Sequence, residues 1–334
     1  MKGWKWDKMK YRKFALSFAI GILASLCVFV YLWNDLLAAL SHVNLLYLPL
    51  VFAMFFLTTL LWCARWKLFL GREIGIKNLF SAVLVGMAVN ALTPFARVGG
   101  EPVRAYILRT NSRIPFREAL ASAIAELLPE VISQIIVVVA SFSIIAYLFS
   151  IPAWMKTALA VVAFLYALVF LGVAGFLDER RIKKFFTYLS FKSSRFSKMR
   201  KRVTRYVFAF QREFKKTLRK RGIFTKAVFL SLLSKFLEVV RIFLIYRALG
   251  YEITLGTAFL LLGLAIVLAS IPSTPGSLGV LEGGMVYALL FLNFPPGAIG
   301  GFLVIDRLVT FWVPLLLGLF IGYRYGVSVR KHLR

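Results

Sequence analysis

The amino-acid sequence predicts an all-α, polytopic integral membrane protein. Of the 334 residues, 60% are hydrophobic and 16% are aromatic, which is more apolar surface than one water-soluble core can bury. The 42 Lys and Arg residues outnumber the 14 Asp and Glu residues and lie mainly between apolar runs, as they do at the flanks of membrane spans. We therefore expect a multi-pass protein of the cell membrane. No recognition motif accompanies the positive charge, so nucleic acid is not an expected partner.

Six apolar runs are long enough to cross the roughly 30 Å hydrocarbon layer of a bilayer. These predicted spans are 14–33, 47–70, 118–149, 155–177, 223–249 and 297–321. Four shorter runs form two adjacent pairs, and each pair is interrupted by Pro and Gly residues. We expect each pair, 78–108 and 254–292, to form a re-entrant helical hairpin, which enters the membrane and returns to the same side.

The basic residues predict the orientation of these elements. Six Lys and Arg residues between positions 2 and 13 place the N-terminus in the cytoplasm by the positive-inside rule, and the basic C-terminal residues place the other end there too. The segment 34–46 has none and is expected to be an outer turn. The cations expected at the inner face after the second span are Arg65, Lys67, Arg72 and Lys77. The most basic segment, 178–222, is expected to lie on anionic lipids of the inner leaflet as an amphipathic helical pair.

A short pattern recurs in the two hairpins. Thr93-Pro94 is followed by Glu101 seven residues after the proline, and Thr274-Pro275 is followed by Glu282 at the same interval. The order span, span, hairpin, span therefore occurs twice, in the regions 1–150 and 151–334. Because the first copy begins inside and the second outside, we expect an inverted-topology repeat, as found in transporters whose two halves rock around a central site.

The interrupted helices are the expected substrate site. A helix that begins at membrane depth offers free N–H groups and a partial positive charge, and both favour binding of phosphate. One arginine side chain can also bind two phosphate oxygens at once. The second break contains no arginine, so Arg307 or Arg241 is expected to supply its positive charge. The predicted substrate-binding residues are Arg97, Glu101, Arg104, Thr274, Ser277, Glu282 and Arg307. Glu101 is also placed to form an intrahelical pair with Arg104, a purely structural alternative.

Further charged residues lie inside predicted spans, where they need partners or a function. Glu126 and Glu130 lie four residues apart on one helix, which suits either proton exchange or binding to basic residues of neighbouring spans. Glu238 with Arg241, and Asp306 with Arg307, are predicted as buried ion pairs that hold helices in register. The two Cys and two His residues are too few and too far apart for a disulfide framework or a zinc site, so neither a metal nor a cofactor is expected.

Two motifs carry a family resemblance. They are NALTPFARVGGEPVR at 90–104 and TPGSLGVLE at 274–282. With them the chain resembles, over nearly its whole length, the flippase-like family named after the transmembrane domain of lysylphosphatidylglycerol synthase. The resemblance implies an integral membrane protein that moves or binds lipids with charged head groups. The chain ends soon after its last span without a soluble aminoacyl-transferase domain, so lysyl transfer is not expected.

Three functions are compatible with these observations. The leading hypothesis is a transporter of flippase or scramblase type, not an enzyme, that moves an anionic or zwitterionic lipid, for example a polyprenyl-phosphate-linked carrier. The first alternative is an intramembrane lipid-modifying transferase or hydrolase in which an embedded carboxylate acts as general base. The second is a membrane scaffold that docks a glycosyltransferase through segment 178–222. The chain contains no phosphate-binding P-loop, which argues against an ATP-driven pump.

Overall fold

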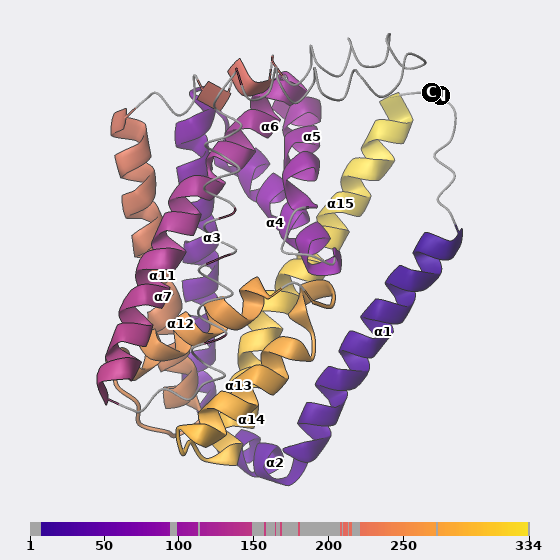
Figure 1. The fold of residues 1–334 in the computed structure, drawn as a ribbon. Helices are drawn as coiled ribbons and strands as arrows, with labels where there is room; N and C mark the ends of the chain where they lie inside the picture. The colour runs from indigo at the N-terminus through magenta and orange to yellow at the C-terminus, as the bar shows by residue number, and fades with distance from the viewer. Residues whose placement is uncertain are drawn as a thin grey trace.

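The computed structural model describes residues 8–93, 99–112, 114–148, 221–271 and 273–332, together with single residues at 157, 164, 168, 180, 208, 210–212, 214 and 215. Arg97 and nearly all of the predicted span 155–177 and the basic segment 178–222 lie outside these residues. Every regular element in the described ranges is a helix, as predicted. Figure 1 shows long helices at the periphery and shorter, interrupted helices between them.

Three continuous helical stretches are long and apolar enough to cross a membrane. They are η1 (Leu45–Tyr47) with α3 (Leu48–Leu70), α6 (Phe116–Ala125) with α7 (Leu127–Leu148), and α14 (Pro296–Arg307) with the π-helical turn η4 (Leu308–Trp312) and α15 (Val313–His332). A fourth helix, α11 (Arg221–Ala248), has 28 residues and carries charged residues in its middle. At about 1.5 Å per residue it is about 42 Å long. This set of apolar helices indicates a multi-pass membrane protein.

Most of the segment 34–46, predicted as a turn, is a helix. The first helix, α1 (Lys8–Tyr31), bends by 71° into a second helix, α2 (Trp33–Ser41). This segment forms a helix because it has an apolar face, which is not evident from its charge content alone. Leu36 and Ala39 are buried, and α2 packs on α14, where Gly300 leaves room for Leu32 and Leu36. Burial of this face stabilises a helix in place of a turn.

Both predicted interrupted pairs are present in the described residues. The first consists of α4 (Ile76–Leu92) and α5 (Gly100–Ser112), and the second of α12 (Leu255–Ser270), the short helix η3 (Pro275–Ser277) and α13 (Val280–Phe291). The longest of the four α-helices, α4, has 17 residues and is about 26 Å long, so none of them crosses a full hydrocarbon layer. The two helices of each pair pack against each other. In Figure 1, α4 and α5 occupy the upper half of the molecule, whereas α12 and α13 occupy the lower half.

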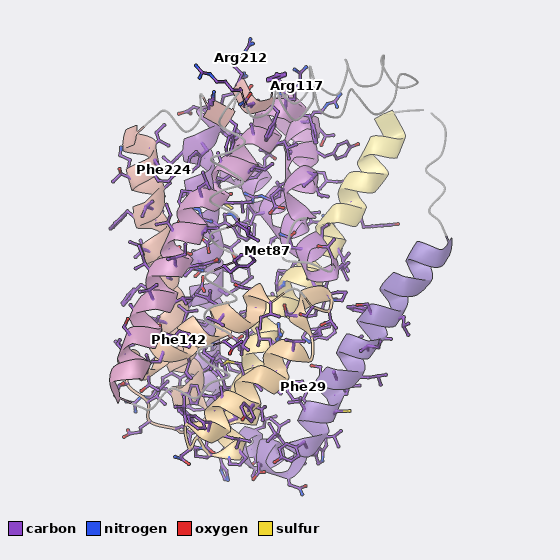
Figure 2. All side chains as sticks on the ribbon, in the orientation of Figure 1. Phe29, Met87, Arg117, Phe142, Arg212 and Phe224 are labelled. Atoms are coloured by element: carbon purple, nitrogen blue, oxygen red, sulfur yellow. The ribbon has the colours of Figure 1, made fainter. Side chains whose placement is uncertain are left out.

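The two pairs meet in the interior. The end of α4 contacts η3, and a Cβ atom added to Gly276 would lie 3.2 Å from the Ala91 carbonyl oxygen. Ala88, Leu278 and Phe311 form a small apolar cluster around this contact. Met87, one turn earlier on α4, packs against both large core clusters and lies near the middle of the bundle in Figure 2. The end of α4 and η3 therefore lie side by side in the interior of the molecule.

Figure 2 also shows Arg117 and Arg212 at the end of the molecule where α5 and α6 meet. An ion pair between Arg72 and Glu118, at 2.9 Å, lies near the start of α6 and is partly exposed. In the last turn of α11, Arg247 pairs with the exposed Glu252 at 2.8 Å.

Candidate functional site

The centre of the candidate site is the carboxylate of Glu126, at the junction of α6 and α7. One oxygen, Oε1, accepts hydrogen bonds from Nε and Nη2 of Arg65 at 2.9 and 2.7 Å. The other oxygen, Oε2, accepts a hydrogen bond from Nη2 of Arg104 at 2.7 Å. All three side chains are at most 3% exposed. Glu126 therefore joins α3, which carries Arg65, to α5, which carries Arg104, through three buried charge-assisted hydrogen bonds.

The ion pairs continue toward α11. Arg65 also contacts Glu130 of α7 and donates a hydrogen bond to Ser231 Oγ of α11 at 2.8 Å. Glu130 pairs with Lys235 of α11 at 2.8 Å, and Lys235 pairs with Glu238 one turn further at 2.8 Å. Three cations and three carboxylates thus alternate in one chain, which we call the buried ion chain: Arg104, Glu126, Arg65, Glu130, Lys235 and Glu238. Of the two interpretations open for Glu126 and Glu130, the structure shows binding to basic residues of neighbouring helices.

The buried ion chain uses only part of the hydrogen-bonding capacity of Arg104. Its guanidinium carbon lies 4.1 Å from the centre of the Trp66 ring and 4.9 Å from that of Trp62, within cation–π range of both. Its Nη2 atom binds Glu126, but Nε and Nη1 are buried and have no hydrogen-bond partner among the described residues. The indole N–H of Trp62 is also buried and has no hydrogen-bond partner among the described residues. Three buried donors therefore lie on two side chains in contact.

Two glycines, Gly86 and Gly100, leave the space between α4 and α5 that the Arg104 side chain occupies. A Cβ atom on Gly86 of α4 would lie 2.5 Å from Cγ of Arg104, and one on Gly100 would lie 2.5 Å from the Gly86 carbonyl oxygen. Because both positions lack a side chain, α4 and α5 approach closely and the Arg104 stem passes between them. Asn90 closes the crossing, because its Oδ1 atom accepts a hydrogen bond from the Gly100 N–H at 2.6 Å. The first amide of α5 is therefore occupied by a side chain, and the predicted free helix end is to that extent wrong.

Glu101 begins α5 beside this crossing and is 5% exposed. It lies within electrostatic range of Arg104 and Glu126 and beside Asn90. Among the described residues it forms no ion pair, because Arg104 directs its bound nitrogen to Glu126. The alternative of an intrahelical Glu101–Arg104 pair is therefore wrong.

In the second hairpin, Glu282 has the opposite environment. Its side chain is fully buried, and its Oε1 atom lies 2.7 Å from Nε of Arg307, as an ion contact without hydrogen-bond alignment. Its Oε2 atom accepts a hydrogen bond from the Gly279 N–H at 2.7 Å, so the first amide of this half-helix is also occupied. Arg307 in turn donates weak hydrogen bonds to the carbonyls of Gly276 and Ser277, at 3.3 and 3.4 Å. Arg307 is therefore the cation of the second break, one of the two suppliers expected.

Thr274 and Ser277 shape the second break. The Thr274 hydroxyl donates to the Leu278 carbonyl at 2.5 Å, and the Ser277 N–H donates to the Thr274 carbonyl at 2.9 Å. Ser277 has φ 55° and Gly276 has φ 64°, both in the left-handed region. Their polar groups hold a tight turn at bilayer depth, where backbone groups must find partners inside the protein.

Two predicted ion pairs are wrong. Glu238 pairs with Lys235 and not with Arg241, and Asp306 pairs with Arg241 of α11 at 3.0 Å and not with Arg307. Asp306 and Arg307 are consecutive, and consecutive residues of a helix point in different directions. Asp306 therefore faces α11, whereas Arg307 faces Glu282. The Asp306–Arg241 pair joins α14 to α11, whereas the Lys235–Glu238 pair lies within α11.

Comparison with known proteins decides the family. Residues 14–318 match the family model described as the lysylphosphatidylglycerol synthase TM region. The chain belongs to this family. It is 28% identical over 331 residues to a UPF0104 membrane protein of Methanothermobacter thermautotrophicus, covering 96% of this chain and 98% of the relative. Relatives with the same description occur in Methanocaldococcus jannaschii, at 25% identity over 93% of this chain and 94% of theirs, and in Pyrococcus horikoshii, at 25% over 89% and 93%.

In this member of the lysylphosphatidylglycerol synthase TM region family, sequence reasoning missed four residues of the site. Arg65 was expected at the inner membrane face, but it is buried and central to the ion chain. Lys235 was not singled out, although a lysine in the middle of an apolar run is a signal by itself. Trp62 and Trp66 lie in a sequence with 32 Phe residues, where aromatic residues carry little information. Within the described ranges no group of His, Cys, Asp and Glu is arranged to hold a metal ion.

Proposed function

We propose that this protein is a lipid transporter of flippase or scramblase type, which moves a lipid with a phosphate head group between the two leaflets. The substrate class is an anionic or zwitterionic lipid, including polyprenyl-phosphate-linked carriers. In this proposal two inverted repeats, 1–150 and 151–334, move against each other, six spans cross the membrane, and both termini are cytoplasmic. The anionic lipids of the inner leaflet bind segment 178–222.

One observation carries the proposal: two interrupted helix pairs meet inside the protein, where the end of α4 contacts η3, and each pair has a buried arginine. Arg104 lies on α5 of the first pair, and Arg307 of α14 contacts Glu282 of the second. Interrupted helices at membrane depth are tolerated where protein or a polar cavity satisfies their backbone, and transporters use them to bind polar substrates. Membership of the lysylphosphatidylglycerol synthase TM region family supports a lipid substrate.

The test is lipid translocation by purified protein in vesicles. Fluorescent phosphatidylglycerol is added during reconstitution, and chemical bleaching of the outer leaflet reports how much of the lipid exchanges. We expect wild-type protein to accelerate exchange over empty vesicles. Arg104→Lys retains a charge opposite Glu126 but lacks the second edge of the guanidinium, and we expect it to slow exchange at least tenfold. Arg72→Ala removes an exposed pair far from the breaks and serves as the matched control.

Two other outcomes identify the alternative functions. A change in the mass of the lipid during incubation indicates a lipid-modifying enzyme. Exchange no faster than in empty vesicles, together with co-purification of a glycosyltransferase that is lost when segment 178–222 is deleted, indicates a scaffold. Equal exchange by wild type and Arg104→Lys contradicts a role of Arg104 in binding.

A further inference from the structure

Six carboxylates inside the predicted spans and hairpins were named in the sequence analysis. In the structure, one of them differs from the other five because it has no ion-pair partner among the described residues. Glu126, Glu130, Glu238, Glu282 and Asp306 each lie close enough to a cation to form an ion pair. Glu101 is the sixth. It is 5% exposed and has no cation within ion-pair distance among the described residues. A buried carboxylate without a counter-ion is costly as an anion, and such a group can be accommodated in its neutral form.

The charged groups that surround Glu101 are few. On its own helix there is Arg104, whose bound nitrogen faces Glu126, and at the end of α6 there is Glu126 itself. Behind Glu126 lies Arg65 of α3. The end of α4 that packs beside Glu101 supplies only the neutral Asn90. Glu101 therefore shares its surroundings with one cation that is already paired.

Arg104, one turn after Glu101, and Trp62 beside Arg104 carry donors that have no acceptor among the described residues. Nε and Nη1 of Arg104 and Nε1 of Trp62 are buried without hydrogen-bond partners in the described part of the chain. Buried polar groups in folded proteins almost always have partners. Nε and Nη1 lie on different edges of the guanidinium, so each can donate one charge-assisted hydrogen bond to a phosphate oxygen, and the indole N–H adds a third donor on a neighbouring side chain.

The charge count decides what else must bind. The buried ion chain has three cations and three carboxylates and is neutral, so Glu101 in its charged form gives this set of described residues one net negative charge. A phosphate group with one negative charge would raise this to two in a medium where like charges repel strongly. If Glu101 accepts a proton at the same time, the net charge remains at one.

We propose that Arg104 and Trp62 bind the phosphate group of the transported lipid, and that Glu101 takes up one proton when the phosphate binds and releases it when the phosphate leaves. This inference rests on the proposed function and adds the coupling ion to it. The ligand chemistry is a phosphate ester with one negative charge. The proton comes from water on one side of the membrane and returns to water on the other, and no covalent bond changes.

Vesicles with an imposed pH difference test the coupling. With one proton per lipid, fluorescent phosphatidylglycerol accumulates in the leaflet that faces the more basic side, by about tenfold for each pH unit. Glu101→Gln keeps the size and the contact with Asn90 but cannot carry the proton. We expect this variant to exchange the lipid and to give equal leaflet populations at every pH difference. Glu118→Gln, in the partly exposed pair with Arg72, is the matched control and retains the tenfold response.

The outcomes separate this inference from the proposed function. If wild type exchanges no lipid, the proposed function fails. If wild type exchanges lipid but leaflet populations ignore the pH difference, or if Glu101→Gln keeps the response, the coupling fails and the transport proposal stands. Uptake of radiolabelled inorganic phosphate into the vesicles, without lipid exchange, identifies free phosphate as the ligand and overturns the lipid assignment.

Two further measurements do not depend on vesicle transport. Adding short-chain phosphatidylglycerol to wild type in weakly buffered detergent should remove about one proton per protein from solution, and Glu101→Gln should remove none. Trp62→Phe keeps a ring against Arg104 but lacks the N–H, and we expect about fivefold weaker binding of the same lipid, the effect of about one hydrogen bond. No proton uptake by wild type, or unchanged affinity in Trp62→Phe, contradicts the site as described.

Discussion

The two hairpins carry the same Thr-Pro and Glu spacing, but they use the glutamate in opposite ways. In the second hairpin, Glu282 is fixed by Arg307 and by the Gly279 N–H, and it closes the start of its own half-helix. In the first, Asn90 closes the half-helix, and Glu101 has no cation within ion-pair distance among the described residues. One spacing in sequence therefore gives a carboxylate with a counter-ion in one hairpin and, among the described residues, a carboxylate without one in the other.

The arginines show the same contrast. Arg307 is used within the second hairpin and its neighbour α14, where it contacts Glu282 and two carbonyls of the break. Arg104 belongs to a chain of charges that reaches α3, α7 and α11, and two of its three nitrogen atoms have no hydrogen-bond partner among the described residues. Nε of Arg307 also has no aligned hydrogen-bond partner, but it lies 2.7 Å from the Glu282 carboxylate. Buried donors usually have partners. Because more donors are without a partner at Arg104, we propose the first break as the binding side.

The largest expected effect is at the carboxylate shared by two cations. Glu126→Gln leaves Arg65 and Arg104 buried with only part of their negative charge, and removal of one partner from a buried pair typically costs about 3–5 kcal/mol. We expect the free energy of unfolding in detergent to fall by about that amount. Chemical denaturation followed by helix content measures it, with Glu118→Gln as the control. A loss below about 1 kcal/mol would mean that the ion chain does not stabilise the fold.

A smaller loss is expected for the second hairpin. In Glu282→Gln the amide oxygen still accepts the Gly279 N–H, but Arg307 loses its counter-charge. Arg307 retains Gly276 and Ser277 as acceptors, so we expect a loss of about 2–3 kcal/mol, the size of a hydrogen bond to a charged group. The same denaturation experiment applies. Wild-type stability in this variant would show that Glu282 is not a structural residue and would remove the contrast with Glu101.

The glycine crossing of the first hairpin gives a third test. Gly86→Ala places a Cβ atom 2.5 Å from Cγ of Arg104, so the arginine stem or α4 must shift. Overpacking of this kind costs about 1–3 kcal/mol, and we expect lipid exchange to fall with stability because Arg104 moves. The matched control is Gly283→Ala in α13, where nothing lies within 4 Å of the added atom. Alanine there is expected to be neutral or stabilising by up to about 1 kcal/mol. Equal effects of the two substitutions would exclude a special role of the crossing.

Local patterns in the sequence predict the elements but not their partners. The hairpins expected at 78–108 and 254–292 correspond to α4 with α5 and to α12 with η3 and α13, because Pro and Gly interrupt a helix wherever it packs. The pairing of Asp306 with Arg241 depends on how α14 lies against α11, and sequence distance does not encode it. Arg65 looked like a flank of a span because lysine and arginine are common there. Its burial depends on Glu126 and Glu130, which are more than 60 residues away in the chain.

The smallest effect on stability is expected at the residue with the largest proposed role in coupling. Glu101→Gln removes a charge that has no counter-ion among the described residues and retains the hydrogen-bonding groups beside Asn90. Because no ion pair is broken, we expect the free energy of unfolding at neutral pH to change by less than about 1 kcal/mol, in either direction. The comparison with Glu282→Gln is direct, since both variants make the same chemical change at the same motif position. If Glu101→Gln loses as much stability as Glu282→Gln, then Glu101 is paired in the membrane, and the charge argument for a proton at this residue fails with it.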